Sequence, residues 1–132
     1  MNPWDGNLTR AYGMPDEVYA NENSPTYASS AYVDSNGFRG YNLDKMVSSS
    51  ITILYADSAM GDANASVGWY RLGVFNTAVG TTGIYLVHNN RANLAYADGH
   101  AAAKTKEELH SESNVMRFVS SDFKSIVLDK NF

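Results

Sequence analysis

The stretch from Val87 to Lys104, VHNNRANLAYADGHAAAK, constrains the fold more than any other part of the chain. Two pairs of turn-forming residues, Asn-Asn at 89–90 and Asp-Gly at 98–99, interrupt its short apolar runs. Asn and Gly tolerate the left-handed backbone that tight turns need, and Asp-Gly between strand-like runs is a strong hairpin signal. The stretch therefore predicts a three-stranded antiparallel meander.

The apolar residues limit how the first two strands of this meander pair, because side chains alternate between the faces of a strand. A two-residue loop at Asn89-Asn90 would pair His88 with Arg91, whereas a three-residue loop pairs Leu86 with Leu94. We expect the three-residue loop, because a slip of one residue would turn a whole apolar set away from the core.

The second turn of the meander is predicted at Asp98-Gly99. A type I′ turn there needs a positive φ at both residues and sets Tyr96 opposite Ala101. The meander would then occupy residues 84–105, with strands at Ile84–His88, Ala92–Asp98 and His100–Thr105.

The chain of 132 residues is most simply one domain, residues 1–132, of the α+β class. Residues 1–50 are rich in Asn, Ser, Tyr and Gly and predict irregular loops, with a short helix at Asp44–Val47. Residues 50–105 predict the sheet, which includes strands at Ser50–Ser58 and Trp69–Phe75 around a loop at Ala59–Gly68.

Residues 105–132 predict a short helix followed by a tail. Thr105 and Glu108 have the spacing of a capping box, in which each side chain binds the backbone amide of the other residue. His110 lies in the polar run after this cap, and we expect it to face solvent. The tail at residues 120–132 is compatible with a helical turn or an edge strand.

Composition excludes several classes of function. With a formal net charge of −4 and ten Lys and Arg without a basic run, a nucleic-acid partner is not expected. The absence of cysteine excludes disulfides and thiolate metal sites. No apolar run is long enough to span a bilayer, and the first ten residues lack a basic and apolar leader.

The polar residues of the stretch have several possible roles. Asp98 and Gly99 suit any tight turn, and a histidine at a strand end is commonly satisfied by one hydrogen bond. A metal site built from His88 and His100 with Asp57 or Asp98 is a weaker alternative, because imidazole and carboxylate are ordinary ligands. The chain carries no nucleophile elbow and no phosphate-binding Gly loop, so we expect no enzyme and no cofactor.

The sequence HNNRANLAYADGHAAA resembles the C-terminal signature of the prepilin-type, H-X9-DG family of bacterial type IV pilin-like or pseudopilin-like proteins. The match is His88, nine residues, and then Asp98-Gly99, with His100 following. Upstream, SSSITILYADSA resembles the strand that precedes this signature and ends in Asp57-Ser58. The resemblance covers about Tyr12 to Thr105.

The resemblance implies a pilin-like antiparallel sheet and a structural, non-enzymatic role at the periplasmic or extracellular side of the cell envelope, in a filament or in type II secretion. Family members carry an N-terminal membrane helix, which these residues lack. Partners would be other pilin-like subunits, or a second copy that binds through the sheet face left by that helix. His88 would bond across the end of the sheet, to Asp57 or Asp98.

A cell-surface binding module for carbohydrate, peptide or Ca²⁺ is the alternative function. Nine tyrosines and two tryptophans, many in polar loops, suit such contacts. The segments Asp34–Gly37 and Asp57–Asn64 offer oxygen ligands for Ca²⁺, although neither matches an EF-hand loop.

Overall fold

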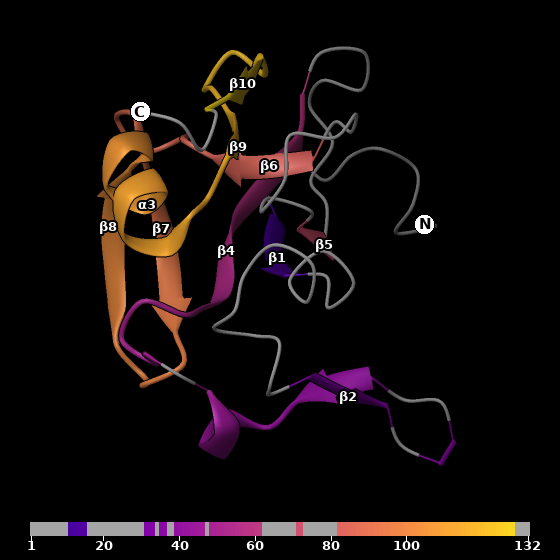
Figure 1. The fold of residues 1–132 in the computed structure, drawn as a ribbon. Coiled ribbons are helices and arrows are strands. Elements are labelled where there is room, and N and C mark those ends of the chain that lie inside the picture. Colours follow the sequence, from indigo (N-terminus) through magenta and orange to yellow (C-terminus); the bar gives the residue numbers. More distant parts are fainter. Residues whose placement is uncertain are drawn as a thin grey trace.

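The computed structural model describes residues 11–15, 31–33, 35–36, 39–46, 48–61, 71–72 and 82–128. Figure 1 shows these residues as strands with one α-helix, so the predicted α+β class is confirmed. The elements are β1 (Ala11–Pro15), β2 (Ala31–Val33), β3 (Arg39–Tyr41), η1 (Leu43–Lys45), β4 (Ile53–Met60), β5 (Arg71–Leu72), β6 (Thr82–Tyr85), β7 (Arg91–Tyr96), β8 (Ala101–Thr105), α3 (Lys106–Ser113), β9 (Arg117–Val119) and β10 (Ser125–Val127).

Strand β4 is the centre of an eight-stranded sheet (Figure 1). The main order is β10-β9-β6-β4-β1-β5, while β7 also pairs with β4 and carries β8 on its other side. The β1/β5 and β6/β9 pairs are parallel and the other pairs are antiparallel. The sheet is therefore mixed, which corrects the prediction of a purely antiparallel one. Strands β2 and β3 form a separate pair.

Strands β6 and β7 lie end to end along β4 instead of pairing with each other. Ile84 pairs with Ser58 and Leu94 pairs with Ala56, and both strands run antiparallel to β4. The first pair of the predicted meander is therefore wrong, and the second pair, β7 with β8, is confirmed. Parallel β9 occupies the other edge of β6, and the long strand β4 offers one edge to both short strands.

The Asn89-Asn90 turn closes a two-residue loop, so the predicted three-residue loop is wrong. His88 and Arg91 exchange two backbone hydrogen bonds of 3.0 and 3.1 Å. Both asparagines have a positive φ, 53° and 61°, as a type I′ turn requires. The apolar pattern was a poor guide to this loop, because the strands on its two sides are not cross-strand neighbours.

The Asp98-Gly99 turn is one residue longer than predicted. Tyr96 pairs with His100, not with Ala101: the Tyr96 amide donates to the His100 carbonyl at 2.9 Å. The Gly99 amide donates to the Tyr96 carbonyl at 3.0 Å, and within this loop only Gly99 has a positive φ, 92°. This is a type I turn followed by a left-handed residue, which needs glycine at one position only.

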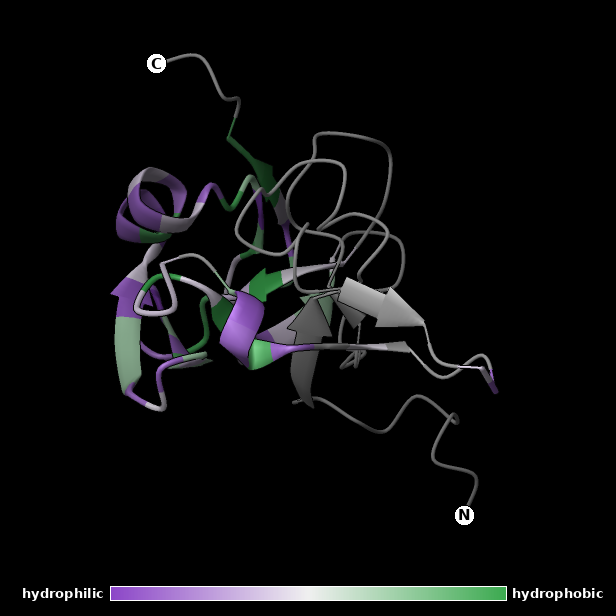
Figure 2. Cartoon of the chain, turned by 60° about the horizontal axis from the view of Figure 1, so that its bottom comes forward, coloured by the Kyte–Doolittle hydropathy of each residue, from purple (hydrophilic) through white to green (hydrophobic). Residues whose placement is uncertain are grey.

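The main core lies between α3 and the sheet. Its buried members are Ile53, Ala56, Ile84, Leu86, Ala92, Leu94, Tyr96, Leu109, Val115 and Phe118. Leu86 and Leu94, the two apolar residues of the predicted pairing, are among them. Figure 2 shows the contrast in hydropathy, with a largely hydrophilic α3 and strongly hydrophobic segments within the sheet. Helix α3 therefore contributes few side chains to the core, chiefly Leu109.

The predicted capping box of α3 is confirmed. The Thr105 amide donates to the Glu108 carboxylate at 2.8 Å, and the Glu108 amide donates to the Thr105 hydroxyl at 3.3 Å. The hydrogen bond from the Thr105 amide lowers the pKa of Glu108. These bonds satisfy two backbone groups at the point where β8 becomes helix.

His110 is buried, so the expectation that it faces solvent is wrong. Its Nδ1 donates to the Val115 carbonyl at 2.7 Å. Asn114 ends α3 in the left-handed conformation and turns the chain back under the helix, which brings that carbonyl to the ring.

Several predicted boundaries shift. Strand β4 begins three residues after Ser50 and runs to Met60, so the expected loop at Ala59–Gly68 starts later; its residues 62–68 lie outside the described residues. Of Trp69–Phe75, the structure describes Arg71 and Leu72, which are strand. The expected helix at Asp44–Val47 is the 3-10 turn η1. The tail contributes β10, one of the edge strands among the described residues.

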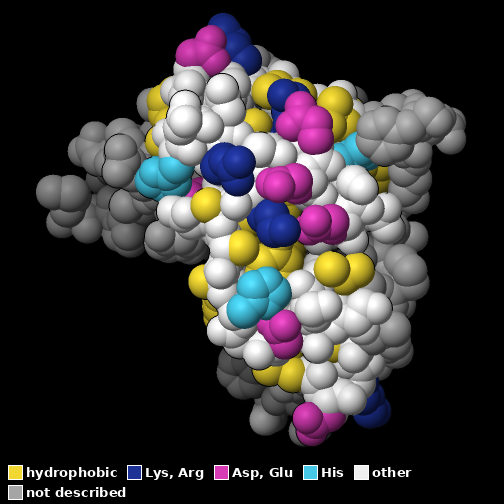
Figure 3. Space-filling view, turned by 90° about the vertical axis from the view of Figure 1, so that its left-hand side faces the viewer, with side chains coloured by type: hydrophobic (Ala, Val, Ile, Leu, Met, Phe, Trp, Pro, Cys, Tyr) yellow, Lys and Arg dark blue, Asp and Glu magenta, His cyan; other side chains and the backbone are white. Residues whose placement is uncertain are grey.

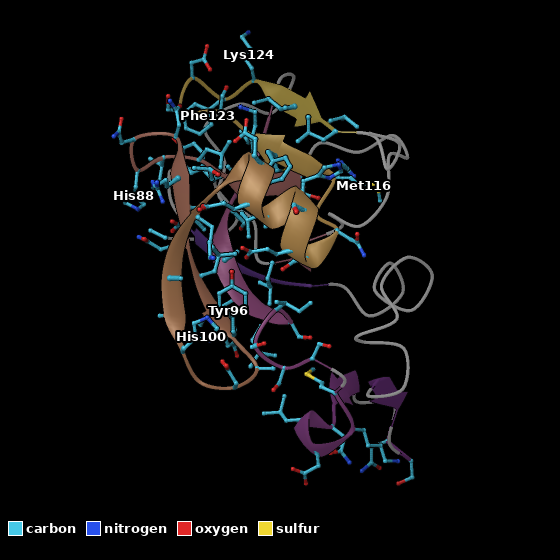
Figure 4. All side chains as sticks on the ribbon, turned by 60° about the vertical axis from the view of Figure 1, so that its left-hand side comes forward. His88, Tyr96, His100, Met116, Phe123 and Lys124 are labelled. Carbon is cyan, nitrogen blue, oxygen red and sulfur yellow. The ribbon has the colours of Figure 1, made fainter. Side chains whose placement is uncertain are left out.

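Phe123 takes a backbone conformation that suits glycine. It lies in the five-residue connection between β9 and β10, with φ 62°, and its ring stacks on Tyr85 with centroids 5.1 Å apart. A left-handed backbone costs a residue with a Cβ about 1 kcal/mol. Figure 4 places Phe123 at the end of the sheet away from Tyr96.

We predict that Phe123→Gly is more stable than Phe123→Ala by about 1 kcal/mol, although both variants lose the stacked ring. The glycine relieves the left-handed strain, and alanine retains it. Urea unfolding of the two variants measures the difference. A Phe123→Ala variant as stable as Phe123→Gly would contradict the strain.

Candidate functional site

The motif residues form two groups at opposite ends of β7. His88 and Asp57 meet near its first residue, and Asp98 and His100 meet just beyond its last residue. The six residues of β7 separate the groups by roughly 20 Å. Figure 4 shows His88 and His100 far apart at the two ends of the β7–β8 hairpin.

The Asp57 carboxylate lies where β6 gives way to β7 along β4. Asp57 is 7% exposed, and its Oδ2 accepts a hydrogen bond from the Asn93 amide at 2.8 Å. The neighbouring residues of β4 pair with Ile84 and with Leu94, so Asp57 faces the excursion between the two strands. Its side chain therefore supplies an acceptor where the regular strand ladder is interrupted.

His88 is the second partner of the Asp57 carboxylate. The Nε2 of His88 lies 3.4 Å from Oδ2 of Asp57, and the His88 side chain is 43% exposed. Of the two partners expected from the sequence, the structure places Asp57 beside His88. The histidine side of this contact is open to solvent, whereas the carboxylate is nearly buried.

Asp98 holds the second turn closed. Its Oδ1 accepts the His100 amide at 3.1 Å and also contacts Nδ1 of the His100 ring. The hydrogen bond from the His100 side chain, followed by the one from its amide, lowers the pKa of Asp98. The His100 ring stacks on Tyr96 with centroids 4.3 Å apart and planes 4° from parallel. Asp98 therefore orients both the backbone and the ring of His100.

The Tyr96 hydroxyl is a polar atom that sequence reasoning missed. Tyr96 is 2% exposed, and its hydroxyl has no hydrogen-bond partner within the part of the chain that the structure describes. Burial, followed by the negative charge of Glu112, raises the pKa of Tyr96 to about 12. The sequence does not predict an unpaired hydroxyl, because the hydroxyl of a buried tyrosine normally makes a hydrogen bond.

We predict that Tyr96→Phe raises the free energy of unfolding by about 1 kcal/mol at pH 7, because it removes a buried hydroxyl without a partner. The pKa of Tyr96 is higher in the folded chain than the ordinary value of about 10. The stability of the parent chain is therefore unaffected by this titration below pH 10 and falls as the pH rises through 12.

Urea unfolding between pH 7 and 12 measures both effects. We expect the stability of the parent chain to fall more steeply than that of Tyr96→Phe above pH 10. Parallel curves would show that another group carries the alkaline transition.

The alternative hypothesis of a metal site needs His88 and His100 as ligands of one ion, and the structure places these two residues far apart. Asp57 with His88 and Asp98 with His100 are separate pairs, and the described residues contain no group of three or more His, Asp or Glu side chains suited to a metal ion. For the Ca²⁺ segments, residues 34 and 37 and residues 62–64 lie outside the described residues. The Asp57 carboxylate already binds an amide and contacts an imidazole.

Comparison with known proteins finds no matching family model, no similar curated protein and no similar solved structure. The described ranges also contain no helix with the length and apolar character needed to cross a bilayer. The resemblance noted from the His and Asp-Gly spacing stays a prediction.

Proposed function

We propose that the chain is a structural, non-enzymatic exported domain of a type IV pilin-like or type II secretion pseudopilin-like protein at the cell envelope. The observation that supports this proposal is that the motif residues bind backbone amides and form a turn. Asp57 binds the Asn93 amide, Asp98 binds the His100 amide, and Gly99 provides the left-handed turn residue. These residues hold the backbone at a strand junction and at a turn, as expected for residues with a structural role.

The proposed partner surface is the face of β4, β7 and β8 opposite α3. Ala102 packs against the core, so the alternate residues Ala101 and Ala103 point to the other face, and both are exposed. Tyr55 pairs with Ala95 on this face and is 48% exposed. Small apolar side chains around an exposed tyrosine suit the close approach of a helix, or of another pilin-like subunit.

The coding sequence that precedes Met1 in the parent gene tests this proposal. We expect it to encode a prepilin peptidase site followed by a long apolar helix. A preceding sequence that encodes an unrelated soluble domain would overturn the pilin-like proposal.

A further inference from the structure

Strand β8 forms an edge of the sheet. Among the described residues it pairs with β7 alone. It lies at the outside of the molecule in Figures 1 and 4. Figure 3 looks directly at this side, where Lys and Arg side chains alternate with Asp and Glu, and hydrophobic side chains are visible between them.

The register of β8 with β7 determines which backbone amides and carbonyls of β8 point towards β7 and which point away from it. The His100 carbonyl accepts the Tyr96 amide, so His100 directs its carbonyl towards β7. Backbone groups alternate along an antiparallel strand, and the register pairs Leu94 with Ala102. The amide and carbonyl of Ala102 therefore point towards β7, and the amides and carbonyls of Ala101 and Ala103 point away from β7.

One end of this edge is already covered. The Thr105 amide is bound by the Glu108 carboxylate, and Nη1 of Arg91 donates to the Ala103 carbonyl at 3.2 Å. Arg91 also lies 3.8 Å from the same carboxylate. Charged side chains that cover edge groups limit unwanted strand pairing. The amide and carbonyl of Ala101 and the amide of Ala103 remain directed outward.

We propose that β8 pairs with β8 of a second copy of this chain, antiparallel, about a twofold axis at Ala102. In this register Ala101 of each copy faces Ala103 of the other, and about four backbone hydrogen bonds join them. A carbonyl can accept two hydrogen bonds, so the Arg91 contact is retained. Two sheets would become one continuous sheet.

Charge and size along this segment favour a second copy as the partner. The sequence from Asp98 to Lys106 is DGHAAAKTK, so antiparallel pairing about Ala102 brings the end of one segment that carries Asp98 towards the end of the other that carries Lys104 and Lys106. Alanines at the centre let two edges approach without a side-chain clash. His100 faces Lys104 of the other copy, but His100 contacts Asp98, and Lys104 lies 3.1 Å from Glu112.

The interface is short, so the dimer is a weak one that forms at high concentration. It differs from the sheet face proposed above as a partner surface, because it uses the backbone edge instead of side chains. The two proposals can therefore fail independently.

Amide hydrogen exchange measured over a range of protein concentrations tests the register. We expect exchange at Ala101 and Ala103 to slow several-fold as the concentration rises, while Ala102 and Lys104, which bind β7, stay protected throughout. Exchange at Ala101 and Ala103 that does not depend on concentration would overturn the proposal. Protection that instead appears only around Tyr55 would assign association to the sheet face and would also overturn it.

A cysteine at Ala102 provides a second test, because the chain has no cysteine of its own. Opposed Cα atoms of a non-hydrogen-bonded pair lie about 4.5 Å apart, within the range of a disulfide. We expect Ala102→Cys to give a disulfide-linked dimer under mild oxidation and Ala95→Cys, on the neighbouring strand, to stay monomeric. Equal cross-linking of both would overturn the register.

A proline at Ala103 tests the hydrogen bonds themselves. Its outward amide makes no bond to β7, so proline is tolerated there, as on other edge strands. We expect Ala103→Pro to remain near 14.5 kDa by sedimentation equilibrium at concentrations where the parent and Ala103→Ser rise towards twice that mass. A dimer that persists in folded Ala103→Pro would overturn the proposal, whatever the exchange data show.

Discussion

Replacing Gly83 by alanine is expected to lower the free energy of unfolding by about 3 kcal/mol. Gly83 is buried in β6 between β4 and β9, where it pairs with Ala59. A Cβ at this position would lie 2.9 Å from the carbonyl carbon of Phe118 and 3.0 Å from its Cα. Both contacts are with backbone, so no side-chain rotation relieves them, and β9 must move away from β6.

Gly99→Ala is the matched control for this prediction. A Cβ at Gly99 meets nothing within 4 Å, but the φ of 92° strains any residue other than glycine. We expect this variant to lose about 1 kcal/mol from backbone strain alone. Urea unfolding of both variants separates the two effects. A Gly83→Ala variant no less stable than Gly99→Ala would show that β6 and β9 are not closely packed.

Replacing Asp57 by alanine is expected to cost about 2 kcal/mol, while replacing His88 by alanine costs less than about 1 kcal/mol. The Asp57 carboxylate is nearly buried and is the acceptor for the Asn93 amide at 2.8 Å, so its removal leaves that amide without this partner. His88 is 43% exposed and lies 3.4 Å from the carboxylate, a distance at which solvent screens the interaction.

Asp57→Asn separates the hydrogen bond from the charge. The amide oxygen of asparagine still accepts the Asn93 amide, so we expect this variant to keep most of the stability lost in Asp57→Ala. Thermal unfolding of Asp57→Ala, Asp57→Asn and His88→Ala gives the order. If His88→Ala proves the least stable of the three, the histidine and not the aspartate holds this junction together.

This expected order changes the weight given to each residue of the motif. From the sequence, His88 was expected to make the bond across the end of the sheet, with Asp57 or Asp98 as its partner. In the structure the stronger contribution to stability is expected from Asp57, which lies outside the stretch from His88 to Gly99. The sequence does not show which side chain accepts a given backbone amide, because almost every residue type carries the same amide.

Interactions between close neighbours in the chain were predictable. The capping box at Thr105 and Glu108 and the α+β class are present as expected. The chain also turns at Asn89 and at Gly99, although neither turn has the predicted length. The inward face of β7 was predictable too, because a strand buries every second residue whatever its neighbour.

Strand partners and turn lengths were decided by the tertiary structure. Pairing energy is nearly the same for any edge that accepts a short strand, so the sequence of β6 does not say that β4 and β9 flank it. The Asp98 turn has one residue more than predicted, and at this turn the Ala97 and Asp98 amides donate to the Thr52 and Ser49 carbonyls, at 2.9 and 3.3 Å. Local residues therefore determined where the chain turns, while long-range packing determined which edges the strands joined, since only the folded chain brings those edges together.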